Sequence, residues 1–567
     1  MIFQWPLYIL VNNMSKYQIN GMNINLNKND FIASGGEGSV FAKGHTAYKI
    51  YGDPKRMINL KKINELSVLK NKSVISPEDV VYKNGKPAGY TMPYVPDTVV
   101  LCQLFTKAFK DRFNITGEMS FGLLRNMQET IKYIHEKNIL IVDLNELNLL
   151  SDHKFKKIYF IDVDSYQTKN YPSTAIMDSI RDRHSEKNVF STNTDWFSFA
   201  IVSFQLLVGI HPYKGKHSSL KGFDARMIKN MSVFNKDVSV PKSCMSLNII
   251  PENYKKWYES VFERGYRGVP PFEDGFVVEI IPQTIISKSS NSFEIKELFE
   301  SYWKIKDYVC NYGQDCVVCD KGYVFDKKKH VKGKTSGLVY YYGSTPFSID
   351  VLDGKLTVFN LKQQQWVNMN ECSAEKIMFS SGRIYAKNAD KILELQFMGS
   401  EHKPMVAANL VGTVMEKATQ MFTGVAIQSV LGTYYASVFP KPGSCVQKRL
   451  KELDGYKIIN GKYEKDILMV VGSKNGRYDK FVYSLNNEAP PRIIKDVQGY
   501  NLNFTVLENG VCVYINENEE VEIFKSNNIN KVKLIQDDNI DGNMRLCSNG
   551  NDVMFYADNK IYGLKMK

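Results

Sequence analysis

The sequence is poor in the features that mark secreted and membrane proteins. Nine cysteines are scattered over 567 residues without the dense spacing of a disulfide scaffold, which favours a reducing cytoplasm. The first residues are partly apolar but lack a basic start and a small-residue cleavage site, so they do not resemble a signal peptide. The longest other apolar run, residues 196–210, is too short to span a bilayer. We therefore expect a cytoplasmic protein that does not cross a membrane.

The sequence also lacks an arginine-rich helix or any recognisable nucleic-acid-binding motif. The net charge is +13, from 73 Lys and Arg against 60 Asp and Glu, and a basic surface can attract nucleic acids or acidic proteins. Charge alone is a weak argument, so nucleic acid is not a favoured partner. The histidines and cysteines show no protease arrangement. One set has a spacing that permits zinc, although the second cysteine pair of a zinc ribbon is missing. That set is Cys310, Cys316, Cys319 and His330.

The length of the chain and a change in its pattern of apolar residues predict more than one domain. A chain of 567 residues is too long for a single hydrophobic core, and 43% hydrophobic with 23% charged residues is typical of a folded protein. Strand-like stretches alternate with helical ones up to about residue 290, and residues 120–137 have a clear helical period. After a polar stretch at residues 287–292 we expect one bridging helix over residues 293–308.

From about residue 310 the pattern changes to short strands separated by turns. Four dipeptides there are typical of hairpin turns. They are Asp353-Gly354, Ser381-Gly382, Asn475-Gly476 and Asn509-Gly510. Roughly 255 residues at ~40–45 per four-stranded blade would fill roughly six blades of a β-propeller. A two-sheet sandwich or a pair of small β domains is the alternative.

A glycine-rich segment occupies residues 33–40 (ASGGEGSV). It fits the pattern G-x-G-x-x-G-x-V, with alanine in the first glycine position. Gly35, Gly36 and Gly38 allow the backbone to approach phosphate groups closely, so that amide groups can hold the charge. Val40 completes the pattern and is assigned with them to the nucleotide site. Any glycine-rich hairpin would satisfy this pattern, so it gains weight only from the segments downstream of it in the chain.

Lys49 lies in the sequence Ala-Tyr-Lys, which is typical of a strand lysine that reaches the α- and β-phosphates of a nucleotide. A carboxylate on a later helix must hold such a lysine, and the segment 61–70 offers Glu65. Taken alone, the two residues also fit a solvated strand lysine and a helix-surface glutamate.

Residues 89–95 (GYTMPYV) are expected to form a buried strand that runs into an extended connection. Such a connection can offer backbone groups to an adenine. Met92 would then guard the pocket behind the base, and Tyr94 and Val95 would line it.

Two acidic segments have the spacing that phosphoryl transfer needs. Asp143 and Asn148 form a D-x-x-x-x-N pattern, in which the carboxylate orients the attacking hydroxyl and the amide holds a metal ion. Asp162 comes directly after the hydrophobic run 158–161, and a hairpin would bring it back to Asn148. We expect its carboxylate to bind Mg²⁺.

The order of these segments resembles the protein kinase superfamily over residues 25 to about 285. The likeness is to divergent bacterial and phage kinase-like proteins whose metal motif reads I-D-V-D-S. It implies a two-lobed α+β fold, with Asp195 bonding the backbone of the catalytic loop. In this assignment Asp143, Lys49 and Glu65 are catalytic, and Asn148 and Asp162 bind the metal.

Several positions depart from the family pattern. Ile141 and Val142 replace His-Arg before the catalytic aspartate, and Asn145 stands where protein kinases have a lysine that touches the γ-phosphate. Asp164 replaces the glycine of D-F-G, where it adds a carboxylate near the metals or caps the turn. No A-P-E segment is recognisable before Asp195.

The sequence therefore predicts an α+β kinase-like domain at residues 25–286, after an N-terminal extension at 1–24. A linker and bridging helix at 287–310 would lead to an all-β, propeller-like domain at 311–567. The predicted function is an ATP- and Mg²⁺-dependent Ser/Thr protein kinase that recruits a protein substrate or partner through the β domain. The alternatives are a pseudokinase whose bound nucleotide controls interactions, or a different transfer reaction on the same fold. A fragment of residues 1–290 would contain every predicted catalytic residue.

Overall fold

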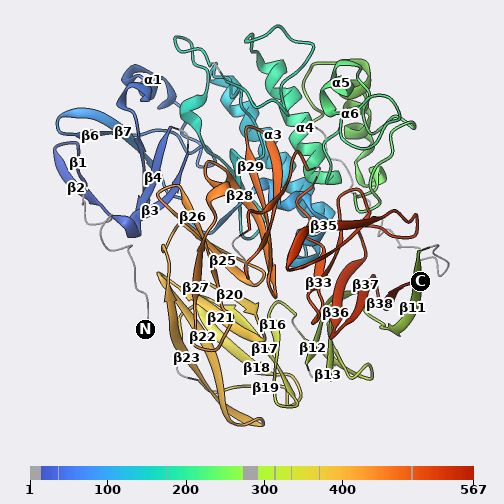
Figure 1. Cartoon of the computed structure of the whole chain (residues 1–567). Coiled ribbons are helices and arrows are strands. Elements are labelled where there is room, and N and C mark those ends of the chain that lie inside the picture. Colours follow the sequence, from blue (N-terminus) through green and yellow to red (C-terminus); the bar gives the residue numbers. More distant parts are fainter. Residues whose placement is uncertain are drawn as a thin grey trace.

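The computed structural model describes two regions, a mixed α+β region at residues 15–272 and an all-β region at residues 292–567 (Figure 1). The description covers residues 15–35, 37–173, 175–272, 292–311, 314–333, 335–369, 371–486, 489–497 and 499–567. The polar stretch predicted as the linker therefore lies almost entirely outside the described residues.

A seven-stranded sheet begins the α+β region. Its order is β2-β1-β6-β7-β5-β4-β3. The strands are β1 (Ser15–Ile19), β2 (Met22–Leu26), β3 (Phe31–Ser34), β4 (Gly38–Lys43), β5 (Thr46–Tyr51), β6 (Val80–Lys83) and β7 (Lys86–Pro93). Residues 15–24, predicted as part of an extension, thus belong to this sheet. The short helix α1 (Leu60–Leu66) comes after β5 and buries Lys62, Ile63 and Leu66.

The rest of the α+β region is mainly helical. Its helices are α2 (Lys107–Phe113), α3 (Gly117–Glu136), α4 (Thr192–Val208), α5 (Phe223–Ile228) and α6 (Glu252–Arg264). Helix α3 confirms the helix expected at 120–137, because its apolar residues recur at helical spacing on one buried face. A small sheet, β10-β9-β8, lies beside these helices. Its strands are β8 (Thr98–Val100), β9 (Leu149–Asp152) and β10 (Ile158–Phe160).

The all-β region consists, over the residues described, of seven four-stranded antiparallel sheets. The first three sheets in the chain contain β12 (Ile305–Asn311), β13 (Gln314–Cys319), β14 (Gly322–Phe325), β15 (Lys329–Lys332); β16 (Leu338–Tyr342), β17 (Thr345–Leu352), β18 (Lys355–Asn360), β19 (Gln365–Trp366); and β20 (Lys376–Ser380), β21 (Arg383–Asn388), β22 (Lys391–Ser400), β23 (Lys403–Thr413).

The next three contain β24 (Thr419–Phe422), β25 (Val425–Val430), β26 (Thr433–Val438), β27 (Val446–Arg449); β28 (Lys457–Glu464), β29 (Ile467–Lys474), β30 (Arg477–Ser484), β31 (Arg492–Ile494); and β32 (Phe504–Val506), β33 (Val511–Ile515), β34 (Val521–Lys525), β35 (Asn528–Ile535). First strands of successive sheets contact one another, as β12 does β16 and β16 does β20.

The helix predicted over residues 293–308 is wrong. The structure has β11 (Phe293–Glu300) there, and then the start of β12. In β11 every second residue at its start is buried, Phe293 and Ile295 among them, which is the period of a strand and not of a helix. β11 pairs with β38 (Lys560–Met566), next to β37 (Asp552–Ala557) and β36 (Arg545–Asn549). The first and last strands of the region therefore share one sheet, which raises the number of four-stranded units from the expected six to seven.

The hairpin predictions are confirmed at all four dipeptides. Asp353-Gly354, Ser381-Gly382 and Asn475-Gly476 each connect two paired strands, and both residues of each have positive φ. That geometry requires residues tolerant of left-handed backbone, which asparagine, aspartate and glycine are. At the fourth, Gly510 has positive φ in a wider turn between β32 and β33.

The proposed cysteine–zinc set is not brought together. Cys316 and Cys319 are an odd number of residues apart on β13, so their side chains point to opposite faces of the sheet. Each packs in a different hydrophobic cluster. Throughout the described part of the chain, no group of three or more His, Cys, Asp or Glu side chains is placed to hold a metal ion. Nor is any helix in those ranges long and apolar enough to cross a membrane.

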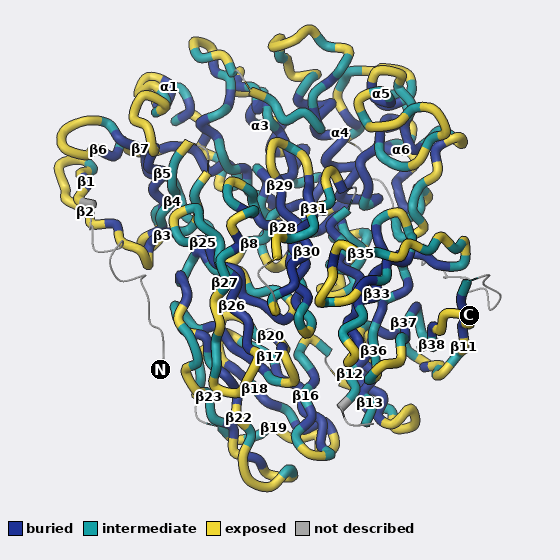
Figure 2. The backbone as a smooth tube through the Cα atoms, in the orientation of Figure 1, coloured by how far each residue is buried: buried dark blue, intermediate teal, exposed yellow. Residues whose placement is uncertain are grey.

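The two regions share one hydrophobic core. A single cluster contains Leu101, Ile131 and Phe204 of the α+β region together with Met469 and Phe504 of the all-β region. Figure 2 shows buried segments on both sides of this contact, where α3 and α4 face β28 to β30. Polar contacts accompany it: Gln103 Nε2 donates to the Ile459 carbonyl at 3.1 Å, and Lys214 Nζ to that of Val497 at 3.3 Å. The all-β region is thus packed onto the α+β region.

We predict that a fragment of residues 1–290 will not fold on its own. It would expose the apolar side of the shared core, and such a surface causes aggregation. The measurement is light scattering and thermal unfolding of the fragment beside the full chain. A soluble, monomeric fragment with a cooperative unfolding transition would contradict the shared core.

Candidate functional site

The β9–β10 hairpin brings Asn148 and Asp162 together, as the sequence predicts. Phe160 pairs with Leu149, and the Ile161 amide donates to the Asn148 carbonyl at 3.0 Å. Asp162 has φ 61°, a left-handed conformation that turns the chain into the short 3-10 helix of residues 163–165. The Ser165 hydroxyl donates to the Asp162 carbonyl at 2.8 Å and closes this turn.

Asp143 lies in the loop of residues 141–148, which leads into β9, and it contacts Asn148. The Asn148 Nδ2 donates to the Asp143 carbonyl at 3.1 Å and lies 3.5 Å from its Oδ2. The other carboxylate oxygen, Oδ1, accepts from the Met177 amide at 2.7 Å. Burial raises the pKa of Asp143, although these hydrogen bonds oppose the rise. Asn145 stabilises the loop internally, because its Oδ1 accepts from the amides of Leu147 and Asn148.

Asp195 at the start of α4 fixes the beginning of the loop, which confirms its predicted structural role. Its fully buried carboxylate accepts from the Ile141 amide at 2.9 Å and the Val142 amide at 2.8 Å. His135 Nε2 lies 2.8 Å from the same carboxylate. Val142 has φ 65°, which a β-branched residue adopts only where its surroundings impose it. The aspartate supplies that constraint.

Lys49 on β5 reaches across to the turn after β10. Its Nζ lies 2.6 Å from Asp164 Oδ2, 3.0 Å from Asp162 Oδ1 and 3.2 Å from Glu37 Oε2. The Tyr51 hydroxyl, on the same face of β5, also donates to Asp164 Oδ2 at 2.6 Å. Lys62 of α1 donates to the Asp164 carbonyl at 2.6 Å. Asp164 therefore accepts hydrogen bonds from two elements, strand β5 and helix α1.

The charges of this cluster depend on one another. Burial alone would lower the pKa of Lys49, but the carboxylates of Asp164 and Asp162 raise it above its ordinary value. For Asp164, burial would raise the pKa, yet Lys49 and the hydroxyls of Tyr51 and Tyr90 hold it below the ordinary range. Burial raises the pKa of Asp162, and Lys49 opposes that rise. Asp164 is thus the carboxylate that Lys49 neutralises most strongly.

The structure does not bring the predicted Glu65 to Lys49. Its Oε1 accepts from Asn170 Nδ2 at 2.6 Å at the protein surface. The physical reason is the face that α1 buries: Lys62, Ile63 and Leu66 point inward, and Lys62 occupies the side that faces the turn of residues 163–165. Asp164 therefore takes the place expected for Glu65, because its Oδ2 accepts from Lys49 and Tyr51. Its role as a carboxylate near the metals stays a prediction.

The glycine-rich segment forms the turn between β3 and β4. Gly38 has a packing role, because an added Cβ would lie 2.2 Å from the Ile50 carbonyl oxygen. Gly35 has open space around the position of a Cβ, which suits the approach of a ligand. Val40 is paired with Lys49 on the neighbouring strand. Gly36 lies outside the described residues.

The predicted base-contacting segment lies at the end of β7. Met92 pairs with Ala47 of β5 and is half-buried. Tyr94 donates its amide to the His45 carbonyl at 2.9 Å, which fixes the chain just after the strand. Tyr94 and Val95 are half-buried. Met92 lies on the strand next to the one that bears Lys49, and Tyr94 and Val95 come directly after that strand.

The oxygen atoms of Asp162 and Asn148 fit a magnesium ion. Magnesium prefers hard oxygen ligands and is commonly held by one or two protein groups together with water and substrate phosphates. The Asp162 side chain is 39% exposed, so its carboxylate is accessible. The Asn148 amide nitrogen is engaged with Asp143, so its amide oxygen would be the atom to hold such an ion.

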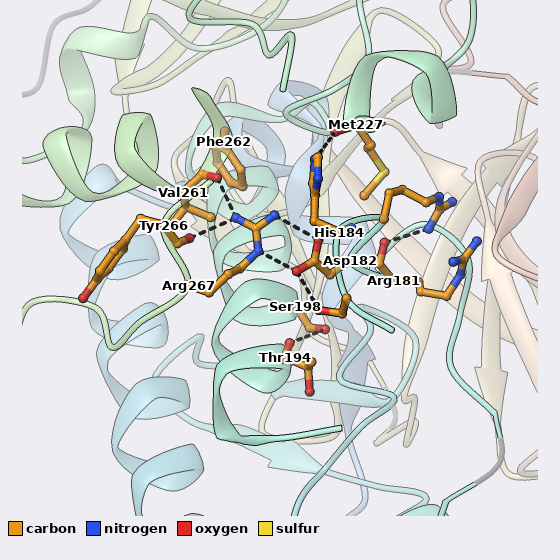
Figure 3. Close-up of polar contacts among 12 residues, drawn as sticks. Arg181, Asp182, His184, Thr194, Ser198, Met227, Val261, Phe262, Tyr266 and Arg267 are labelled. Carbon is orange, nitrogen blue, oxygen red and sulfur yellow. Dashed lines mark hydrogen bonds and ion pairs between the residues drawn. The ribbon is translucent and has the colours of Figure 1, made fainter. Parts of the chain in front are cut away.

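An ion pair anchors the segment between Asp162 and α4 (Figure 3). Arg267, just after α6, donates to Asp182 through Nε at 2.6 Å and Nη2 at 2.9 Å. The Asp182 carboxylate also accepts from the His184 amide at 3.0 Å and the Ser185 hydroxyl at 2.9 Å. Burial would raise the pKa of Asp182, but these bonds and the arginine charge hold it below its ordinary value.

Sequence reasoning missed several residues of the site. Tyr51 was findable, because it is two residues after Lys49 and must share its face of the strand. The roles of Lys62 and Met177 depend on the placement of α1 and of the 175–185 segment, for which the sequence has no signal. Two residues of the all-β region also contact the 141–148 loop, Lys457 and Tyr478.

We predict that Asp164→Asn will lower the free energy of unfolding by about 1.5–3 kcal/mol, because it weakens charged hydrogen bonds to a buried lysine. Glu65→Gln, an equally conservative change, should lower stability much less, since Glu65 is only half-buried and hydrogen-bonds the uncharged residues Asn170 and Thr168. Urea denaturation of both variants measures the difference. Equal effects, or a larger one for Glu65→Gln, would contradict the assignment.

A second prediction concerns the Asp182–Arg267 pair. Removing the arginine in Arg267→Gln leaves a buried carboxylate uncompensated, which should cost about 3–5 kcal/mol near neutral pH. Because the folded-state pKa of Asp182 is depressed, its stabilising contribution is present above the ordinary carboxyl pKa and is lost as the pH falls through the folded value. The deficit of the variant should therefore shrink below about pH 4.

Arg264→Gln is the matched control, because Arg264 is exposed at the end of α6. Thermal unfolding from pH 3 to pH 8 measures both variants. A deficit for Arg267→Gln that does not change with pH, or that matches Arg264→Gln, would rule out the ion pair as the cause.

Comparisons with known proteins leave the function to be argued from this geometry. No protein-family model and no curated protein matches the chain. Among solved structures, the chain is similar to the kinase PK-1 of Cydia pomonella granulovirus. The TM-score is 0.31 with 15% sequence identity, and the match covers 41% of this chain and 88% of that chain. A likeness at this level carries no argument about fold or function.

Proposed function

We propose that this protein is an ATP- and Mg²⁺-dependent protein kinase that phosphorylates serine or threonine hydroxyls. The observation that carries the proposal is the convergence of Lys49, Asp143, Asn148 and Asp162. They come from β5, the 141–148 loop and the end of β10. Lys49 contacts Asp162, Asn148 contacts Asp143, and the backbone bond from Ile161 to Asn148 joins the two pairs. A lysine, a metal-binding pair and a carboxylate for the acceptor are the groups that phosphoryl transfer uses.

In this proposal Asp143 orients the acceptor hydroxyl and takes its proton. The hydroxyl oxygen forms a bond to the γ-phosphorus, the bond between that phosphorus and the β,γ-bridging oxygen breaks, and ADP leaves with the bond's electron pair. Lys49 pairs with the α- and β-phosphates, and Asp162 and Asn148 would hold Mg²⁺. A bound Mg²⁺ supplies neutralisation of phosphate charge.

The nucleotide is proposed to lie between the glycine-rich turn and the 162–164 turn. Gly35 has open space around it, and Lys49 projects from the adjacent strand. The adenine would lie against the segment of Met92, Tyr94 and Val95. Glu37 contacts Lys49 from the same turn, so phosphate binding would compete with that ion pair.

The all-β region is proposed to be a seven-bladed β-propeller that also presents a surface to a protein substrate or partner. The seven four-stranded antiparallel sheets, the contacts between their first strands, and the pairing of β11 with β38 support this arrangement. Loops displayed by a rigid β scaffold are a common place for binding.

A second candidate is a pseudokinase that binds nucleotide without transferring phosphate. One observation favours it: Asp143, the proposed base, already accepts a hydrogen bond from the Met177 amide. Nucleotide-induced thermal stabilisation without product would identify this case.

We predict that Asp162→Asn will abolish phosphoryl transfer and that Asp143→Asn will lower it at least a hundredfold while ATP affinity stays within a few-fold. The first change removes a metal carboxylate, and the second removes the acceptor's proton partner. The assay is transfer from γ-labelled ATP with Mg²⁺ by the purified full chain, with and without host lysate.

Asp237→Asn is the control for this pair, since Asp237 is exposed and its side chain has no role in the site. Nucleotide binding is measured in parallel by thermal shift. Wild-type levels of transfer in both site variants would exclude the proposed enzyme.

A further inference from the structure

Two residues of the all-β region hold the 141–148 loop directly. Lys457, at the start of β28, donates its Nζ to the Leu147 carbonyl at 2.8 Å. The Tyr478 hydroxyl, near the start of β30, donates to Glu146 Oε1. Glu146 is 1% exposed and lies between Asp143 and Asn148 in the chain. The two contacts therefore restrain the loop at its middle, between the two residues proposed to act in transfer.

The Tyr478–Glu146 contact is buried and the Lys457–Leu147 contact is partly buried, so both are costly to break. Both partners of the Tyr478–Glu146 hydrogen bond are buried. Burial raises the pKa of Tyr478 well above its ordinary value, so its hydroxyl keeps its proton and remains a donor. Removing the hydroxyl would leave a buried carboxyl group without that donor, which is more costly than losing a surface contact.

The tip of the same hairpin lies against the side chain of Met177, a residue that bonds Asp143. The turn Asn475-Gly476 joins β29 to β30, and a Cβ added to Gly476 would lie 2.6 Å from Met177 Cγ. The Met177 amide donates to Asp143 Oδ1 at 2.7 Å. A single hairpin thus contacts the loop at Glu146 through Tyr478 and lies against the Met177 side chain at Gly476. Glu146 is three residues from Asp143 in the chain, and Met177 bonds the Asp143 carboxylate.

We infer that the β29–β30 hairpin, together with Lys457, positions Asp143 and Asn148 for phosphoryl transfer. The all-β region then acts on the reaction within its own chain, in addition to any partner that it binds. This inference rests on the proposed function. Tyr478, Lys457 and Gly476 are positioning residues, because they contact the loop or Met177 and not the reacting groups.

Two glycines provide a matched test in the full-length protein. Gly476 and Gly354 both come after a residue of positive φ in a two-residue hairpin turn, with φ of 73° and 74°. The backbone strain of an alanine is therefore the same at both positions. A Cβ at Gly354 would meet nothing within 4 Å, whereas a Cβ at Gly476 must displace Met177. Any difference between the two variants reports the contact with Met177.

We expect Gly476→Ala to lower kcat about tenfold or more with the KM for ATP within about twofold, because small displacements of a reacting group cost large factors in rate. Gly354→Ala should retain wild-type kcat. A Gly476→Ala variant that matches Gly354→Ala would overturn the inference. A raised kcat would also overturn it, since the contact would then be inhibitory.

Hydrogen exchange of residues 141–149 separates this inference from the proposed function. Tyr478→Phe and Lys457→Met should each increase exchange of that loop, whether or not the wild-type protein transfers phosphate. Tyr478→Phe combined with Glu146→Gln should exchange less than Tyr478→Phe alone, because the neutral amide costs less to bury. Lys242→Ala, which removes an exposed contact between the regions with the Asp538 carbonyl, is the control.

If the wild-type protein transfers no phosphate but the loop responds as expected, the proposed kinase activity is excluded. The restraint of the 141–148 loop by the all-β region is then still supported. If transfer is normal and the loop does not respond to Tyr478→Phe or Lys457→Met, the positioning role fails.

Discussion

The ammonium group of Lys49 is almost fully buried, and the rest of the site depends on how its charge is compensated. A buried cation without a partner would cost several kcal/mol, so carboxylates must lie within reach. Asp164 and Asp162 meet this need from the turn after β10, at 2.6 and 3.0 Å. The ion cluster therefore fixes the seven-stranded sheet against the helical half of the α+β region, at the place where the groups proposed to bind a metal lie.

The 141–148 loop is held from three sides. Asp195 binds its first two amides, Asn145 closes it internally, and the all-β region reaches its middle. The left-handed conformation of Val142 costs about 1–3 kcal/mol and persists only where the surroundings determine it. Hydrogen bonds to charged groups contribute about 1.5–3 kcal/mol each, so several together are sufficient to hold the loop.

Elements that depend on residues close together in the chain could be predicted from the sequence. Which side chains contact each other across the fold could not. The hairpin that joins Asn148 to Asp162 and the helix at 120–137 result from short-range period and spacing. The replacement of Glu65 by Asp164 depends on which face of α1 is buried, and one short helix does not specify that. The helix expected at 293–308 was wrong because its apolar residues fit both periods, and pairing with β38 at the distant end of the chain selects the strand.

Because it shares a hydrophobic core with the α+β region, the all-β region contributes to the stability of the site. A recruitment module can be joined by a linker, because it needs only proximity to its neighbour. Here the apolar residues of β29 and β32 complete the same cluster as those of α3 and α4, so removing them would expose the helices on which the 141–148 loop depends. The all-β region must be present for this core to form, and the 141–148 loop packs on the core. The stability of the loop therefore depends on the all-β region. The site is therefore a product of both regions, although every residue proposed to touch the nucleotide comes from the first.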